Sequence, residues 1–340
     1  VLAFKKNLEN DKENFEQIRN NINEFIGINQ FKKFKDISLK DILIFNKKIY
    51  ISYTGEIKQD CWNINVIYGD INYERITFKK LFAPKNCIHS KDNIDKEFTP
   101  SQTGGRMISF DDNHILLSIG DFYADGVNGP MLSQDLNNDY GKIFKININN
   151  KKHEIYSYGH RNPQGLYVDK NKNIFSTEHG PRGGDEMNLV KVNNNYGWPY
   201  ATFGTNYKSY NAYTNDIKKT EVDSKRIWPI DKTNNTHDDY TKPIFSWGNT
   251  FGVSNLIVYE NKYFDKWNKN IIVSSLAGKQ LARFVYDYDN NSIIYLENIL
   301  INKRIRDIIS LENGNIVLLT DIGNEMTEHA EIILLSKSEN

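Results

Sequence analysis

Short segments in which apolar and polar residues alternate, separated by polar turns, fill most of this 340-residue chain. A period of two is typical of a strand with one buried and one exposed face. Turn sequences such as FDDN, DKNKN, DYDNN and LENGN end the segments. Besides a hairpin over 41–53 around Asn46-Lys47 and another over 62–82, we expect strands at 114–119, 142–148, 154–158, 173–177, 186–192, 255–259, 271–275, 282–288, 293–300, 306–310 and 315–320.

Many short strands with almost no long helical pattern indicate an all-β protein, and at this length we expect a β-propeller. A repeated strand–turn–strand unit, as in LYVDKNKNIFST and IISLENGNIVLLT, supports one repeat per blade without a WD or kelch signature. A large sandwich or two stacked barrels are the alternatives.

The N-terminal segment has a different pattern. We assign residues 1–33 to a helical or irregular segment and residues 34–340 to the propeller. A polar insertion over 201–240 is long enough to be functional or mobile. The helical expectation rests on apolar residues at helical spacing, namely Phe15, Ile18, Ile22, Phe25 and Ile26.

Charge and hydropathy exclude several classes of partner. The chain has 43 Lys+Arg and 43 Asp+Glu, a net charge of zero, which argues against nucleic acid as the main partner. No apolar run has the length of a membrane-spanning helix. A charged run follows Val1–Phe4 at once, so no signal peptide is expected inside this numbering, and a targeting segment removed ahead of Val1 fits the missing Met.

Two cysteines, Cys61 and Cys87, flank the hairpin over 62–82 near its open end. A disulfide between them and two free thiols in the core are equally compatible with this spacing.

Two turns close together carry the densest chemistry. The first, GHRNPQG at 159–165, is cationic; the second, EHGPRGGDE at 178–186, is shaped to hold a metal. Gly and Pro bend both turns, so their carbonyls can point at a ligand. Charged groups at the mouth of a β-structure suit an anionic cofactor.

Ten segments in order carry a resemblance to a known family. They are GGR (104–106), IGD (119–121), SQDL (133–136), GKI (141–143), GHRNPQG (159–165), EHGPRGGDEMN (178–188), NYGWP (195–199), SLAG (275–278), RIRD (304–307) and LTD (319–321). The chain resembles the soluble PQQ-dependent sugar dehydrogenases, the glucose/sorbosone and aldose sugar dehydrogenase family. The resemblance covers about residues 98–340, whereas residues 1–97 match poorly.

The resemblance implies a six-bladed propeller, with a first blade that is missing, degenerate or replaced, and with PQQ and calcium on the upper face. PQQ is a flat o-quinone with three carboxylates, which Arg binds bidentately. In RIRD two arginines alternate on one strand face. The expected cofactor-binding residues are Arg161, Asn162, Lys279, Arg304 and Arg306.

The same resemblance implies calcium at the carbonyls of Gly180 and Pro181, in keeping with the preference of calcium for hard oxygens. A calcium bound to a quinone oxygen acts as a Lewis acid. The neighbouring acids Asp185 and Glu186 either orient this turn or bond to Arg161.

One departure affects catalysis. Where the family has a general-base His, this chain has Gln102, and a neutral amide cannot accept the proton. Arg161 is the second expected catalytic residue, and His160 and His179 are the candidates to replace the base. Where family members often carry a Lys, this chain has Ala277, and Lys279 is expected to substitute from the same strand face.

Two functions follow from these expectations. The first is PQQ- and calcium-dependent oxidation of an aldose sugar or related polyol, weakened by Gln102, in the periplasm or outside the cell. The alternative is a non-catalytic propeller that binds a carbohydrate or a protein partner. A small-molecule sugar is the expected partner; the sequence names neither the sugar nor the electron acceptor.

Overall fold

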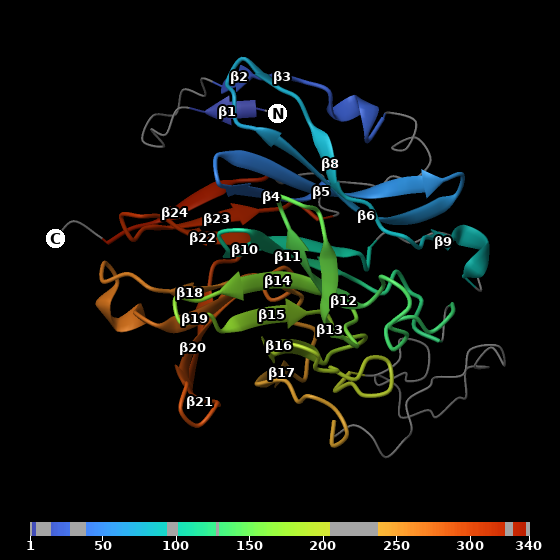
Figure 1. Cartoon of the computed structure of the whole chain (residues 1–340). Coiled ribbons are helices and arrows are strands. Elements are labelled where there is room, and N and C mark those ends of the chain that lie inside the picture. The colour runs from blue at the N-terminus through green and yellow to red at the C-terminus, as the bar shows by residue number, and fades with distance from the viewer. Residues whose placement is uncertain are drawn as a thin grey trace.

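The computed structural model describes residues 2–4, 15–27, 39–93, 101–126, 129–204, 237–323 and 329–337. In this part of the chain the regular structure is β-sheet, apart from three single 3-10 turns (Figure 1). These turns are η1 (Ile22–Glu24), η2 (Ser90–Asp92) and η3 (Asp265–Trp267). The all-β prediction is therefore confirmed.

Five antiparallel sheets follow one another along the chain, each a meander of neighbouring strands. The first contains β4 (Leu39–Phe45), β5 (Lys48–Lys58), β6 (Cys61–Asp70), β8 (Lys79–Phe82) and β9 (Ile88–His89). The second contains β10 (Gly104–Asp111), β11 (His114–Ile119), β12 (Lys142–Asn147) and β13 (His153–Tyr158). The third contains β14 (Pro163–Val168), β15 (Ile174–Glu178), β16 (Asp185–Val190) and β17 (Phe245–Trp247). The fourth contains β18 (Val253–Tyr259), β19 (Asn270–Ser275), β20 (Gln280–Asp287) and β21 (Ser292–Leu300), and the fifth β22 (Ile305–Ser310), β23 (Ile316–Thr320) and β24 (Ile332–Leu335).

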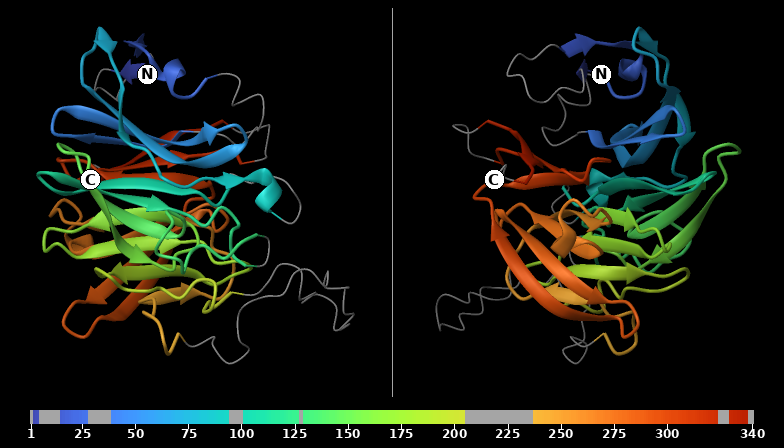
Figure 2. Two further views of the ribbon diagram at one scale, coloured as in Figure 1. Left: turned by 45° about the vertical axis from the view of Figure 1, so that its right-hand side comes forward. Right: turned by 90° about the vertical axis from the view of Figure 1, so that its left-hand side faces the viewer.

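These sheets are the blades of a propeller. The first strand of each sheet contacts the first strand of the next, in the order β4, β10, β14, β18, β22. Figure 2 shows the sheets fanned out in chain order, from the blue first sheet to the red last one. Apolar side chains fill the spaces between adjacent sheets, as where Phe82 of the first sheet meets Phe144 of the second.

The described residues form five blades, so the prediction of six is wrong in number. The resemblance supplied the sixth blade, and the described residues of the N-terminal region do not build it. Its described strands are too short for a blade: β1 (Leu2–Phe4) pairs only with β2 (Phe15–Gln17), and β3 (Arg19–Asn20) pairs with β7 (Arg75–Ile76). The expectation of a degenerate first blade fits this arrangement.

Of the helical and irregular alternatives for the N-terminal segment, residues 15–27 show no α-helix. Two short strands and the single turn η1 occupy this stretch. Ile18 and Ile26 are buried in the core cluster of the first two sheets. Tertiary burial of these two side chains accounts for the apolar spacing that we attributed to a helix. The proposed domain boundary at residue 33 stays a prediction, and most of the 201–240 insertion lies outside the described residues.

Arg106 ties the inner strands together at the centre of the ring. Its Nη1 donates to Asp41 Oδ1 of β4 at 3.2 Å and to Asp307 Oδ2 of β22 at 3.0 Å. Its Nε donates to the Gln164 carbonyl of β14 at 2.9 Å. The guanidinium thus joins the first and last of the five sheets, which are the farthest apart in the sequence.

Cys61 and Cys87 form a disulfide with Cα atoms 5.2 Å apart. The pairing of β6 with β8, and of Cys61 with His89 of β9, brings them together at the open end of the predicted hairpin. Of the two alternatives left by the sequence, the disulfide is therefore the one observed.

Candidate functional site

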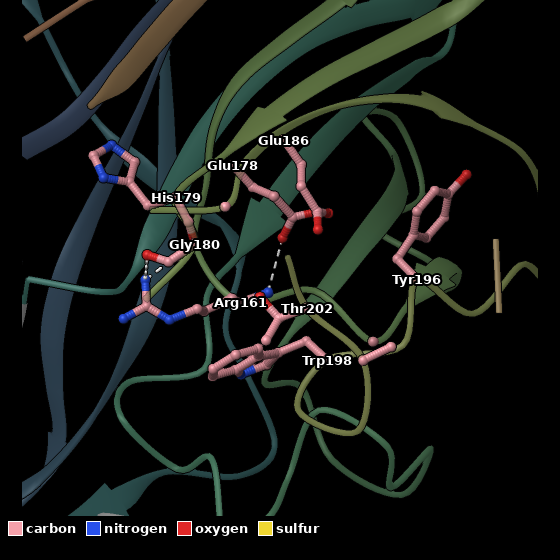
Figure 3. A pocket seen from close by; sticks show the side chains of 11 residues that line it. Arg161, Glu178, His179, Gly180, Glu186, Tyr196, Trp198 and Thr202 are labelled. Carbon is pink, nitrogen blue, oxygen red and sulfur yellow. Dashed lines mark hydrogen bonds between the residues drawn. The ribbon is translucent and has the colours of Figure 1, made fainter. Parts of the chain in front are cut away.

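The two motif turns lie side by side because β14 pairs with β15. Pro163 at the start of β14 is directly opposite Glu178 at the end of β15. The cationic turn leads into β14 and the second turn follows β15, so both turns lie at the same end of this strand pair. A small pocket lies at these strand ends (Figure 3). It is lined by Gly159, Arg161, Glu178, His179, Gly180, Gly184, Glu186, Tyr196, Trp198, Ala201 and Thr202.

Arg161 is the central cation of this pocket and is only 5% exposed. Its Nη1 donates to the carbonyls of His179 at 3.0 Å and Gly180 at 2.7 Å. The guanidinium lies over the Trp198 ring, 5.2 Å from the ring centre. In Figure 3 the Gly180 carbonyl and the Trp198 ring lie on opposite sides of it. The buried Nε has no hydrogen-bond partner in the described structure, which leaves a donor available to an anionic ligand.

Glu178 holds the backbone of the cationic turn. One carboxylate oxygen accepts the Arg161 amide hydrogen at 2.9 Å. The other accepts from His160 Nδ1 at 3.1 Å and from Asn188 Nδ2 at 2.8 Å. A buried carboxylate with three donors is satisfied, so we assign Glu178 to positioning of the turn.

Asp185 performs the same task for the second turn. Its Oδ1 accepts the Gly180 amide hydrogen at 3.1 Å. Its Oδ2 accepts the amide hydrogens of Phe251 at 3.1 Å and Gly252 at 2.6 Å. Of the two roles open to this acid, Asp185 therefore orients the turn.

Glu186 lines the pocket beside Glu178. Burial and the nearby charges of Glu178 and Asp185 raise the pKa of Glu186 well above its usual value, against a hydrogen bond from Asn188. His237 Nε2 lies 3.5 Å from Glu186 Oε1, and its ring stacks on Phe203. Burial lowers the pKa of His237 to about 4, so both partners of this pair favour their neutral forms.

Arg304 and Arg306 do not line this pocket but share one carboxylate, that of Asp321. Arg304 Nε donates to Asp321 Oδ1 and Arg306 Nε to Asp321 Oδ2, both at 2.8 Å. The two arginines thus meet at one carboxylate, but not through alternation on a strand face, because Arg304 precedes β22 and the strand pairing shifts register between Ile305 and Asp307. Their proximity to Arg161 stays a prediction, supported by one electrostatic relationship: the charges of both Arg161 and Arg306 act on His179, adding to the burial that lowers its pKa.

The other predicted cofactor residues have different surroundings. The Asn162 side-chain oxygen accepts from the Gly104 amide at 3.1 Å and from Gln164 Nε2 at 2.8 Å, so it links the GGR segment to the cationic turn. The expectation that Lys279 shares a strand face with Ala277 is wrong. β19 ends at Ser275 and β20 begins at Gln280, so both residues lie in the connecting turn, where Lys279 has φ 52°.

Gln102 is buried beside the pocket rather than in its lining. Its carbonyl accepts the Phe122 amide hydrogen at 3.0 Å, and the preceding Asp121 amide donates to the Arg161 carbonyl at 2.8 Å. Gln102 Oε1 is buried without a partner in the described structure. An unsatisfied buried oxygen of this kind marks a place for a donor that the described residues do not supply.

The two histidines proposed as substitutes for the base differ. His160 is fully buried, bonded to Ser157 and Glu178, and stacked on Tyr196 with ring centres 4.6 Å apart. Both ring nitrogens are therefore occupied by structural partners. His179 lines the pocket, and its Nε2 is buried without a partner among the described residues.

The described residues suit the two implied ligands, PQQ and calcium, to different degrees. The unpaired Nε of Arg161 and the arginine pair at Asp321 suit a ligand with several carboxylates, as PQQ has. For calcium, Gly180 offers a carbonyl that already accepts from Arg161. No group of three or more His, Cys, Asp or Glu side chains in the described ranges is arranged to hold a metal.

Sequence reasoning missed several residues that build the site. Trp198, Tyr196 and Asp321 lie in the NYGWP and LTD segments, to which we attached no role. Asp121 lies in the IGD segment and is fully buried, accepting from Trp198 Nε1 at 2.7 Å. The matched segments were the sequence signal for these residues. Their hydrogen-bond partners can be identified only once the strand pairing is known.

Comparisons with known proteins agree with this geometry. A family model described as glucose/sorbosone dehydrogenase matches residues 33–328. Aldose sugar dehydrogenase YliI of Escherichia coli is 28% identical over 305 residues, covering 84% of this chain and 73% of that protein. An uncharacterized Synechocystis protein, slr1608, is 30% identical over 240 residues, covering 65% of this chain but only 54% of its own length.

A solved structure supports the fold. The PQQ-bound form of an aldose sugar dehydrogenase from Streptomyces coelicolor superposes with a TM-score of 0.61 at 18% identity, covering 88% of this chain and 79% of that chain. At this identity the likeness establishes the propeller fold alone. No helix in the described ranges is long and apolar enough to cross a membrane.

Proposed function

The chain belongs to the glucose/sorbosone dehydrogenase family, and from this premise we propose that the protein oxidises an aldose sugar or related polyol with PQQ and calcium. The observation that carries the proposal is Arg161, a buried cation with an unpaired Nε at the edge of a pocket. A buried guanidinium with a free donor favours an anionic ligand, because desolvation strengthens the attraction between the two charges.

Each residue has a defined task in this proposal. Arg161, Arg304 and Arg306 bind the carboxylates of the quinone, and Glu178 holds Arg161 in place through its backbone. A bound o-quinone supplies hydride acceptance. The carbonyls of Gly180 and Pro181 bind calcium, and Asp185 fixes the turn that presents them. Asn162 acts indirectly, by joining the GGR segment to the cationic turn.

Proton removal is the weak part of the proposed reaction. The sugar hydroxyl must lose a proton as hydride leaves its carbon, and Gln102 cannot take it. A missing general base typically costs about 10²–10⁴ in rate. We therefore propose that the sugar binds beside Gln102 and that the unpaired Oε1 of Gln102 accepts a hydrogen from a sugar hydroxyl. Turnover is slow in this proposal.

The disulfide between Cys61 and Cys87 supports a location in the periplasm or outside the cell, where such bonds persist. The non-catalytic alternative is not favoured, because the Escherichia coli relative named above is an aldose sugar dehydrogenase.

Dye reduction tests the proposal. Apo protein is loaded with PQQ and calcium, and a panel of aldoses is added with an artificial electron acceptor. Slow reduction that needs sugar, quinone and protein together supports the proposal. Absence of sugar-dependent reduction in protein that demonstrably holds the quinone would leave a binding role instead.

A further inference from the structure

Asp321 occupies an unusual position, between two cations of the proposed cofactor site. It follows β23 directly, and its amide donates to the Arg304 carbonyl at 3.0 Å. Each of its carboxylate oxygens accepts from the Nε of a different arginine, at 2.8 Å. Arg306 Nη2 donates to Oδ2 as well. The Gly323 amide completes the set with a bond to Oδ1 at 2.9 Å.

These contacts leave a particular set of donors open. Arg304 uses only Nε among the described residues, so its two Nη groups are available, and Arg306 keeps Nη1. The Nη1/Nη2 edge of a guanidinium is one of its two edges that can bind a carboxylate with two parallel hydrogen bonds, the other being Nε/Nη2. Both side chains are reachable by a ligand, since Arg304 is 27% and Arg306 43% exposed.

Gly323 leaves the room that this arrangement needs. Arg304 runs past Gly323, where a Cβ would lie 2.7 Å from its Nε, and Gly323 has φ 57°. A side chain at residue 323 would push Arg304 out of place. Although burial opposes it, the hydrogen bonds and charges of the two arginines lower the pKa of Asp321, so the carboxylate stays ionised at neutral pH.

We infer that Asp321 is a positioning residue that presents the open edges of Arg304 and Arg306 to a carboxylate-bearing planar ligand. This inference rests on the proposed function, in which that ligand is the quinone. Free arginine side chains lose rotamer entropy when they bind a ligand, and holding them beforehand removes that cost. Asp321 thereby improves binding although its own charge repels an anion.

The two effects of Asp321 have opposite signs, which makes the inference testable. If the carboxylate acted only through its charge, removing that charge would tighten anion binding. If it positions the arginines, the same removal weakens binding. Asp321→Asn makes this change with almost no change in volume. We expect PQQ to bind the variant about tenfold more weakly, the usual scale for a lost charged hydrogen bond.

The measurement is an equilibrium titration of apo protein with PQQ, followed by quinone absorbance, with thermal unfolding as a check on the fold. Glu297→Gln is the matched control, because Glu297 pairs with Arg283 Nε at 2.6 Å on another blade. We expect its affinity for PQQ to equal that of the wild type. Tighter or unchanged binding by Asp321→Asn would overturn the inference.

A mutant cycle separates positioning from a merely structural role. In a background carrying Arg304→Gln and Arg306→Gln, Asp321→Asn should have no further effect on PQQ affinity. A persistent tenfold loss in that background would show that Asp321 acts through something else and would contradict the inference. If Asp321→Asn does not fold, Asp321→Glu keeps the charge but displaces it; weaker binding then supports positioning, and unchanged binding overturns it.

A second probe distinguishes failure of this inference from failure of the proposed function. Benzene-1,3,5-tricarboxylate is flat and carries three carboxylates but is not a quinone. Wild-type protein that binds this anion but not PQQ would reject the proposed function, and Asp321→Asn is then compared on the anion with the same two outcomes. Wild-type protein that binds neither would overturn both.

Discussion

The Nη1 atom of Arg161 lies 2.7 Å from the carbonyl oxygen of Gly180, so the expected anion-binding cation is a direct partner of an expected calcium ligand. A calcium ion at that oxygen would lie close to the guanidinium, and the two positive charges would repel each other. A ligand with several carboxylates supplies the negative charge that makes both cations compatible. Calcium and quinone binding should therefore depend on each other.

The first prediction concerns this dependence. Millimolar calcium alone should leave the melting temperature of the apo protein nearly unchanged, whereas calcium added with PQQ should raise it above the value with PQQ alone. Thermal unfolding under the four conditions measures the coupling, which is reciprocal by linkage. Strong stabilisation by calcium alone would mean that it binds away from Arg161, and magnesium serves as the control cation.

The second prediction concerns Gln102. Replacing it by His restores a proton acceptor at the position where the family has its base. In protein loaded with PQQ and calcium, Gln102→His should raise sugar-dependent dye reduction by about tenfold or more. Gln102→Asn, which introduces no base, is the control. Fast wild-type turnover would instead point to another acceptor, such as His179.

The third prediction uses Asp121. Burial raises the pKa of Asp121 to about 8, helped by Asp125 and opposed by Arg161 and Trp198. Because this value lies above the ordinary one near 4, the folded protein holds a proton that the unfolded chain releases. The stabilisation is complete below about pH 4 and is lost as the pH rises through about 8.

The test for Asp121 is the slope of unfolding free energy against pH. Wild-type protein should lose stability between about pH 4 and pH 8, and Asp121→Asn, which has no such proton, should lose less over the same range. Urea unfolding at several pH values gives both slopes. Equal slopes in the two proteins would mean that Asp121 is ionised in the folded state.

The fourth prediction concerns the disulfide. Cys61 and Cys87 are 26 residues apart, and closing a loop of this size restricts the unfolded chain. Replacing both by Ser should lower the free energy of unfolding by roughly 2–4 kcal/mol. A reductant should destabilise the wild type by a similar amount and leave the double variant unaffected. Indifference of the wild type to a reductant that cleaves the bond would contradict the prediction.

Much of the fold was predictable because most strands pair with the next strand along the chain. Hairpins such as β4–β5 around Asn46-Lys47 carry their own period and turn, and both turn residues have positive φ. The strand β10 escaped prediction because GGR resembles a turn, and β14 was predicted only over its last three residues, LYV, because PQG also resembles a turn. The number of blades cannot be predicted from local sequence, since it depends on how many sheets pack around one axis.

The site was predictable in its residue types but not in its partnerships. Arg161, Arg304 and Arg306 were visible as cations in matched segments. That Asp321 would hold two of them, and that Gly180 would hold the third, depends on strand register across β22–β23 and on a turn between β15 and β16. Lys279 failed because its strand ends four residues earlier than the argument assumed.

Quinone binding by the buried cation Arg161 is central to the proposed function. Titration of apo protein with PQQ should give saturable binding at one quinone per chain, and Arg161→Lys, which cannot form the same bidentate contact, should weaken it by about tenfold or more. Arg283→Lys is the matched control, because Arg283 also lies over a tryptophan ring, that of Trp267, in another blade. Saturable binding in the wild type and the control, with loss in Arg161→Lys, is the result we predict. Equal affinity in all three proteins, or no binding by the wild type, would contradict the account.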